Sequence, residues 1–409
     1  MNPWPMVRAD LIAMRWTAVV VVVLVGLAVA IGVAIGAQER ALRQGSARAA
    51  DDFDLVVGAP GSQTQLVLTT VYLQPEALPL MDGTVLAALA ADPRAADVAP
   101  LAFGDIIRGY PVIGTTARFA SRWGRLAPSE GRMFAIEDEA VIGADVRLAL
   151  GDSVTPSHAG EPAHPGEESE QERTHRHEGV HYRVVGRLPR LGTPWDRAIL
   201  IPVESVWETH GLGDGHRAEG ATIGPPFDAT PVPPTPALVV KPRSVADAYA
   251  LRARFRTGGT MAVFPAEVLV GVYRTLGDVR DVVVVAAALN DLLVFLVVVL
   301  LMVTLIGMRR RRYAVLRALG APPSYVLLVT WLGSALLLAA GCLAGAALGW
   351  AGAYWVAAIL EQRTGLAVPI AFGADQAVLV ALLVLAGSVL AAIPALVAWR
   401  APPADALRG

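Results

Sequence analysis

A short arginine-rich segment between two long apolar stretches decides the topology of this chain: residues 309–322 read RRRRYAVLRALGAP. Four consecutive arginines directly after an apolar run are typical of the cytoplasmic end of a membrane-spanning helix. The apolar residues behind them are spaced to lie along one face of a short helix, which Gly320 and the prolines after it would end. The arginines alone are equally well explained as a topology signal, but the helix behind them also predicts a docking surface for a partner.

The composition indicates a membrane protein. Hydrophobic residues make up 54% of the 409 residues and charged residues only 17%, a balance that purely soluble chains rarely show. Most of the excess lies in four blocks, each at least about 20 residues long, which as helix would cross a hydrocarbon core of about 30 Å. The sequence predicts an α-helical membrane protein with four transmembrane helices and a mixed α/β extracytoplasmic domain between the first and second helices.

The flanking arginines set the orientation. Arg8 and Arg15 precede the first block, and Arg400 and Arg408 follow the fourth, so that both termini are expected in the cytoplasm. The first block ends in small residues and could be a cleaved signal peptide, but its apolar run exceeds the typical signal core of about 7–15 residues, which favours an uncleaved anchor. The expected segments are a cytoplasmic N-terminus 1–16, spans 17–37, 281–308, 325–360 and 376–399, an outside domain 38–280, a cytoplasmic segment 309–324, an external loop 361–375 and a cytoplasmic tail 400–409.

The outside domain shows strand and helix patterns in turn. The runs at 66–73, 180–188, 198–203 and 237–241 are rich in Val, Ile, Leu and Thr and predict strands. Residues 82–91 and 244–256 predict helices, the second with Ser244 as its N-cap. We expect Gly58–Ser62 to form a turn that leads into the first strand, and Trp195–Arg197 to form a surface turn. Residues 38–50 and 266–308 could extend the first and second spans as helical stalks.

The histidines are concentrated in one hydrophilic stretch of the outside domain. All seven lie between His158 and His216, and a glutamate-rich loop, residues 155–181, separates the two strands of an expected hairpin, 152–156 and 181–188. Imidazole and carboxylate groups are suitable ligands for Zn²⁺, so the loop is either a metal-binding segment or a solvated linker. The candidate metal ligands are His158, His164, His175, His177 and His181.

Enzymatic chemistry is not expected in this chain. Residues 177–181 spell the His-Glu-x-x-His pattern of zinc proteases, but that pattern needs a helix, and Gly179 and Val180 make a helix unfavourable. A phosphate-binding Walker A loop needs a lysine followed by Ser or Thr, whereas Lys241 is followed by Pro242. No catalytic residues are therefore proposed. The net charge of −2, without a basic stripe, gives no indication of nucleic-acid binding.

The third block carries a row of small residues that lets helix backbones approach closely. Such a row packs spans of one chain together or forms the seam of a homodimer, and the sequence leaves both possibilities open. Cys342, the single cysteine, lies in the same block, so no intramolecular disulfide can form and the outside domain must be held by its core. The helix-packing residues are Gly341, Gly345 and Gly349.

The arrangement as a whole resembles the FtsX/MacB-like permeases of ABC transporters, the mechanotransmission class. The resemblance rests on one span, a large outside domain and three further spans, on residues 311–321, RRYAVLRALGA, and on the closing pattern from Pro394 to Arg408. The family often has an acidic residue where this chain has Tyr313. The histidine-rich loop departs from the general pattern and is similar to a metal-associated subgroup.

The resemblance implies a set of partners and a location. It implies a separate cytoplasmic ABC ATPase, which holds ATP and Mg²⁺, a second permease copy in a homodimer, a periplasmic or outer-membrane partner, and a place in the bacterial inner membrane with the large domain in the periplasm. On this hypothesis Zn²⁺ at the histidine loop is the only cofactor of the chain itself. The alternative is a membrane-anchored metal-sensing or scaffold protein without an ATPase. The ATPase-coupling residues implied by the resemblance are Arg309, Arg310, Arg311, Arg312, Tyr313, Leu316, Arg317, Leu319 and Gly320.

Overall fold

The chain folds into two units, one of helices and one built on a β-sheet. The computed structural model describes residues 2–157, 177, 179–217, 222–228, 230, 232–274, 320–370 and 374–390, with a few isolated positions between 285 and 316 and at 392. The first unit comprises Met1–Leu42, Gly277–Ile359 and Val368–Gly409, and the second comprises Arg43–Leu276 and Leu360–Ala367. Helices α2 and α10 therefore contribute residues to both units.

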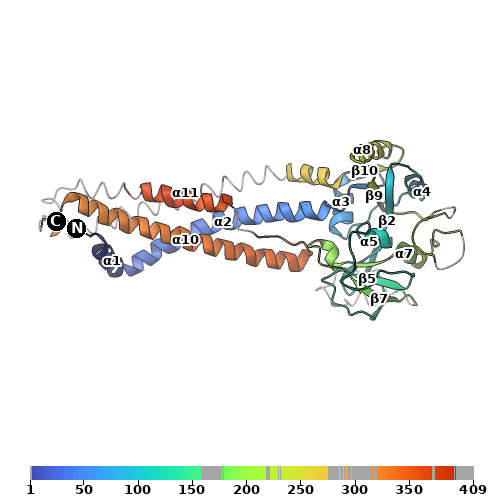
Figure 1. The fold of residues 1–409 in the computed structure, drawn as a ribbon, viewed down its shortest axis with the longest axis horizontal. Helices are drawn as coiled ribbons and strands as arrows, with labels where there is room; N and C mark the ends of the chain where they lie inside the picture. Colours follow the sequence, from blue (N-terminus) through green and yellow to red (C-terminus); the bar gives the residue numbers. More distant parts are fainter. Residues whose placement is uncertain are drawn as a thin grey trace. The chain divides into compact units, whose positions relative to one another are not determined.

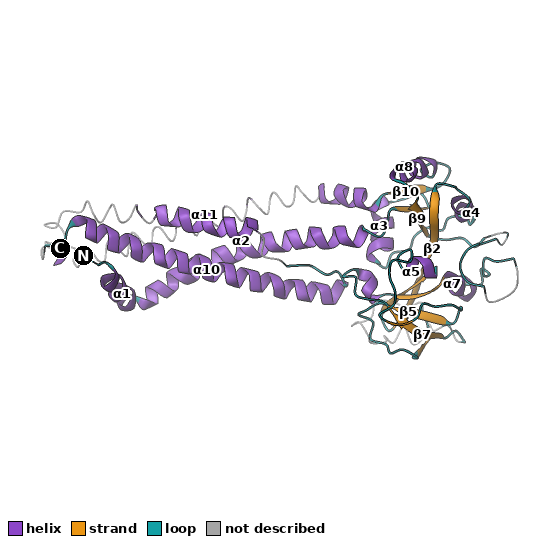
Figure 2. Cartoon of the chain, in the orientation of Figure 1, coloured by secondary structure: helices purple, strands orange, loops and turns teal. Residues whose placement is uncertain are grey.

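Long apolar helices form the first unit (Figures 1 and 2). Its described elements are α1 (Trp4–Ala13), α2 (Arg15–Ala50), α10 (Pro323–Thr364) and α11 (Ala374–Leu390). Helices α2 and α10 are long and apolar enough to cross a membrane and contain the expected spans 17–37 and 325–360. Helix α11 covers the first part of the expected span 376–399, whereas the expected span 281–308 lies almost entirely outside the described residues. The structure thus identifies two candidate spans among the described residues, and the count of four remains a prediction.

Glycines bring α2 and α10 into backbone contact. A Cβ at Gly345 would collide with the carbonyl oxygen of Gly26, and a Cβ at Gly341 would lie 2.7 Å from the Cβ of Val25. A Cβ at Gly349 would in turn collide with the carbonyl oxygen of Ala30. The row of small residues therefore packs two helices of the same chain, the first of the two possibilities that the sequence left open. Helix α11 joins the pair, because the Trp331 indole donates a hydrogen bond to the carbonyl oxygen of Ser388 at 2.9 Å.

A ten-stranded, mainly antiparallel sheet forms the framework of the second unit. The strand order is β10-β1-β9-β2-β3-β8-β5-β7-β4, with β6 paired to β7; the β3–β8 and β5–β7 pairs are parallel. The strands are β1 (Leu55–Gly58), β2 (Ala95–Ile107), β3 (Tyr110–Thr115), β4 (Glu130–Gly131), β5 (Glu139–Ile142), β6 (Ser153–Val154), β7 (Tyr182–Arg187), β8 (Ile199–Pro202), β9 (Ala237–Pro242) and β10 (Met261–Val263).

Both faces of this sheet are covered, which gives two separate cores. Successive residues of a strand point to opposite faces: Val57 belongs to one core and Val56 to the other. Helices α4 (Thr84–Ala90), α7 (Val203–Thr209) and α8 (Val245–Arg254) supply the first core. Helices α3 (Gln63–Tyr72) and α5 (Ala117–Ala120), the 3₁₀ helix η1 (Pro194–Arg197) and the end of α2 supply the second.

Most sequence predictions for this domain are confirmed. Strands β7, β8 and β9 and helices α4 and α8 lie where they were expected, and the Ser244 hydroxyl caps α8 by accepting from the backbone N–H of Asp247. Strand β6 pairs with β7 in antiparallel register, so the histidine-rich loop does separate the strands of a hairpin. Helix α2 continues to Ala50, as the stalk hypothesis required.

The expected strand at 66–73 is wrong, because these residues belong to helix α3. The Ser62 hydroxyl accepts a hydrogen bond from the backbone N–H of Gln65 and starts the helix, and Leu73, with a φ of 53°, ends it in the left-handed conformation. The buried Thr70 hydroxyl donates to the carbonyl oxygen of Leu66 at 2.7 Å. A short apolar run fits a buried helix as well as a strand, and burial of one helix face against the sheet outweighs the strand preference of its β-branched residues. The Gly58–Ser62 turn therefore leads into a helix.

The glycine contact between α2 and α10 gives a first prediction. Gly345→Ala should destabilise the helical unit, because the new Cβ meets backbone that cannot rotate away. Gly352→Ala lies in the same helix, and no atom of the described residues comes within 4 Å of the place that its Cβ would take. This variant should be neutral or slightly stabilising, since alanine is the better helix former by about 1 kcal/mol. Thermal unfolding of the full chain in detergent measures both, and equal melting temperatures for the two variants would contradict the packing.

Candidate functional site

The ends of two long helices meet the sheet domain at one place, which we call the helix-end junction. It consists of Gly45 and Ser46 near the end of α2, Tyr273, and the segments 190–197 and 360–367, all within the second unit. A Cβ at Gly45 would lie 2.6 Å from the carbonyl oxygen of Ala367. The Ser46 hydroxyl is hydrogen-bonded to the hydroxyl of Tyr273. The end of α2 is thus in close contact with the segment that follows α10.

The segment after α10 is attached to residues 190–197 by backbone and side-chain bonds. The N–H of Ala367 donates to the carbonyl oxygen of Gly192 at 3.1 Å, and the Arg197 guanidinium donates to the carbonyl oxygen of Arg363 at 2.5 Å. Arg190 pairs with Glu361 at 2.9 Å and also with Asp145. Arg190 is exposed, so its ion pairs contribute little stability.

A buried carboxylate fixes the conformation of the 190–197 segment. The side chain of Asp196 accepts hydrogen bonds from the backbone N–H groups of Leu191 at 2.8 Å and Gly192 at 2.6 Å. Burial raises the pKa of Asp196, and these backbone N–H groups oppose that change. The Trp195 indole donates to the carbonyl oxygen of Val71 at 3.2 Å. The expected surface turn at Trp195–Arg197 is therefore wrong for its first two residues, each 1% exposed, because their polar atoms are satisfied inside the domain.

A buried arginine lies beneath this segment. The Arg122 guanidinium lies 4.6 Å from the ring centroid of Trp195 and 5.0 Å from that of Phe119, and it pairs with Asp52 at 3.0 Å. Burial lowers the pKa of Arg122, and Asp52 counteracts that effect. Aromatic faces and a carboxylate together stabilise a desolvated cation. These contacts of Arg122 therefore stabilise the position of Trp195 in the 190–197 segment.

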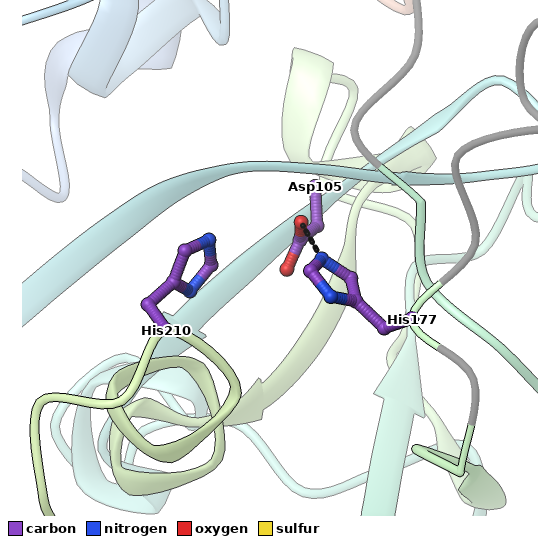
Figure 3. Close-up of side chains that lie close together, drawn as sticks. All are labelled: Asp105, His177 and His210. Atoms are coloured by element: carbon purple, nitrogen blue, oxygen red, sulfur yellow. Dashed lines mark ion pairs between the residues drawn. The ribbon is translucent and has the colours of Figure 1, made fainter.

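Two of the five candidate metal-binding histidines lie among the described residues, and they do not meet. His181 Nδ1 is 2.9 Å from the Thr155 hydroxyl, whereas His177 lies beside Asp105 and His210 (Figure 3). His158, His164 and His175 lie outside the described residues. No sequence pattern marked Asp105, a single carboxylate in a strand, and His210 stood out only as one of seven clustered histidines. The fold brings these three side chains together from distant positions in the chain.

Comparison with known proteins matches the C-terminal part of the chain to a family model. Residues 284–403 match the family model described as FtsX-like permease C-terminal. This segment of the chain is therefore similar to the C-terminal part of FtsX-like permeases. The matched residues include the arginine-rich segment and part of the closing pattern on which the sequence resemblance rested.

Two solved structures are similar to this chain over about half of its length. The periplasmic region of MacB from Actinobacillus actinomycetemcomitans is 9% identical, with 54% of this chain and 94% of that chain covered and a TM-score of 0.33. The extracellular domain of the noncanonic ABC-type transporter YknZ from Gram-positive bacteria is 12% identical, with 51% and 98% covered and a TM-score of 0.30. The comparison with curated proteins gave no match.

The ATPase-coupling residues that the sequence predicted lie mostly outside the described residues. Leu316 and Gly320 are described: the carbonyl oxygen of Leu316 accepts from the N–H of Ala321 at 3.0 Å, and Gly320 has a φ of +92°. This is the left-handed conformation that glycine adopts at helix ends, as expected from the sequence. Those outside the described residues are Arg309, Arg310, Arg311, Arg312, Tyr313, Arg317 and Leu319.

The arginine beneath the junction gives a second prediction. Arg122→Ala should lower the free energy of unfolding of the domain by about 3 kcal/mol, because it removes a buried charge that compensates Asp52 and packs on aromatic rings. Arg125→Ala is the matched control: Arg125 also pairs with Asp52, at 2.5 Å, but is 57% exposed, and its loss should cost less than about 1 kcal/mol. Thermal unfolding followed by tryptophan fluorescence compares them, and similar losses would show that burial of Arg122 is unimportant.

Proposed function

We propose that this chain is the permease subunit of an ABC transporter of the FtsX/MacB type, which converts ATP hydrolysis by a separate cytoplasmic ATPase into movement of its sheet domain. The observation that carries the proposal is the match of residues 284–403 to the FtsX-like permease model. The proposal places the chain in a bacterial inner membrane, with the sheet domain in the periplasm. ATP and Mg²⁺ bind the partner, because the only lysine of this chain, Lys241, is followed by proline.

The helix-end junction supports a mechanical role. Helix α2 is continuous over 36 residues and contributes residues to both units, and a continuous helix transmits displacement along its axis. At the junction its end contacts the segment after α10 through backbone at Gly45 and Ala367. A displacement of either helix end therefore acts on the Asp196-stabilised segment and, through Trp195, on one core of the domain.

The finer parts of the proposal concern partners and metal. The permease acts as a homodimer, its arginine-rich segment 309–320 contacts the ATPase, and a periplasmic or outer-membrane component receives the movement. The histidine-rich loop links this activity to zinc. The alternative is a membrane-anchored metal-sensing or scaffold protein without an ATPase, which the concentration of histidines in one loop would also suit.

Purification of the tagged chain from its native membrane in mild detergent distinguishes the permease proposal from the scaffold alternative. We expect a nucleotide-binding subunit in stoichiometric amount, which is lost in Leu316→Glu because a charge is placed on the apolar side of the docking helix. Leu316→Met conserves the apolar side chain and should retain the subunit. A folded, monodisperse chain that never brings an ATPase with it would support the scaffold alternative instead.

Transmission through the junction gives a separate prediction. Gly45→Ala should leave ATP hydrolysis by the complex intact and abolish most of the ATP-dependent movement of the domain, because the added Cβ separates α2 from Ala367. Gly36→Ala, in the same helix and with no atom of the described residues within 4 Å of its added Cβ, should preserve both activities.

Movement can be followed with a single fluorophore. Tyr249, 60% exposed on α8, is a suitable position, as Tyr249→Cys in a Cys342→Ser background, because Cys342 is the only native cysteine. An ATP-dependent fluorescence change that is unaltered by Gly45→Ala would show that the junction does not transmit movement.

A further inference from the structure

We infer that Asp105, His177 and His210 form a binding site for Zn²⁺ or a divalent transition-metal ion of the same class (Figure 3). The inference deepens the metal link of the proposed function by naming its site, two ligands of which lie outside the histidine-rich loop. It rests on the geometry of the described residues only. The proposed ligand set does not include His158, His164 or His175.

The carboxylate is positioned by an irregularity in β2. The pairing of β2 with β3 shifts register between Ala102 and Asp105, and Gly104 in between has a φ of +137°. An extra residue in one strand redirects the side chains beside it. Asp105 is buried, with a side chain only 1% exposed, and a buried carboxylate requires a compensating charge.

The first imidazole is held against this carboxylate by backbone bonds on both sides. The N–H of His177 donates to the carbonyl oxygen of Pro156 at 3.1 Å, and its own carbonyl oxygen accepts from the N–H of Val180 at 3.2 Å. Next to Pro156, Ser157 exchanges two backbone hydrogen bonds with Ile106, at 2.9 and 3.0 Å. Both described ends of the histidine-rich loop are therefore attached beside Asp105, and His177 Nε2 lies 3.4 Å from Asp105 Oδ1.

The second imidazole follows the last residue of α7. His210 Nδ1 lies 2.7 Å from the carbonyl oxygen of Val206, and a carbonyl oxygen only accepts, so Nδ1 carries the proton. In the neutral ring, Nε2 is then the nitrogen with a lone pair for a metal. Metal-binding histidines commonly donate their other ring N–H to a backbone carbonyl in this way, which fixes tautomer and ring orientation.

The distances and donor types together favour zinc. The three ligand atoms lie within 4.8 Å of one another, and two ligands at about 2.1 Å from a tetrahedral ion are about 3.4 Å apart, the separation of the Asp105 and His177 atoms. His210 is exposed and follows a helix end, so a small shift of this residue that keeps its Nδ1 bond to Val206 would complete the set. Two imidazoles and one carboxylate suit Zn²⁺ and not Mg²⁺ or Ca²⁺, which take oxygen ligands.

A simple ion pair between His177 and Asp105 is the competing explanation. It involves only two of the three groups and does not account for His210, whose ring centroid lies 5.7 Å from that of His177. One divalent ion satisfies all three groups. The ion would also join three segments of the sheet domain: β2, the end of the histidine-rich loop and the end of α7. Metal binding would therefore change the stability of the sheet domain, which is the part proposed to move.

Zinc titration of the full chain in detergent tests the site. In a background with His158, His164 and His175 all changed to Ala, we expect about one high-affinity Zn²⁺ per chain, measured by competition with a chromophoric chelator. His210→Ala and Asp105→Asn in that background should each weaken binding at least 10-fold, on the order of the loss expected at a metal site. His181→Ala is the matched control and should have no effect, because His181 bonds to Thr155.

Two further measurements distinguish loss of the metal site from loss of folding, and neither requires the ATPase. Co²⁺ bound to the unchanged site should show the visible absorption of tetrahedral coordination, and Zn²⁺ should raise the melting temperature of the background protein but not that of its His210→Ala form. The inference is wrong if the background protein binds no Zn²⁺, or if binding persists in both His210→Ala and Asp105→Asn. Co-purification of an ATPase involves no metal, so the permease proposal and the metal site fail separately.

Discussion

Direct backbone contact at glycines is the constraint on which much of this structure depends. In lipid there is no hydrophobic gain from bringing apolar helices together, so close packing has to supply the association. The α2–α10 contact meets this requirement at Gly345, where a Cβ would collide with the carbonyl oxygen of Gly26. Within the sheet domain the same device recurs at Gly45 against Ala367. On the proposed function, these backbone contacts would transmit small displacements between the helices.

On the proposed function, the sheet domain would receive such displacements through strands that contribute residues to both of its cores. Val56 and Val57, neighbours in β1, belong to opposite cores. The helix-end junction contributes Trp195 to one core. His177 lies at the end of the histidine-rich loop, and His210 follows α7, a helix that packs into the other core. The proposed metal site and the junction are therefore distinct places in one domain, connected by the sheet.

Buried charge is found at places where the fold needs a fixed shape. Asp196 holds its segment through two backbone N–H groups, and Arg122 lies between Asp52 and aromatic rings. Both groups carry a desolvation penalty that only well-formed partners offset. Asp105 follows the same rule, since it lies beside an imidazole and, on our inference, a divalent ion.

The sequence by itself determined the long helices α2 and α10 and the similarity of residues 284–403 to FtsX-like permeases, because long apolar runs and arginine clusters are local signals that tertiary structure does not alter. It also located Ser244 as an N-cap and the hairpin that carries the histidine-rich loop, since caps and turns depend on a few adjacent residues. Only the tertiary structure decided that residues 66–73 form a helix, that Trp195 and Asp196 are buried, and that Asp105 meets His177 and His210. A short apolar run does not specify its period, and contacts between residues far apart in sequence arise from sheet pairing, which no local pattern records.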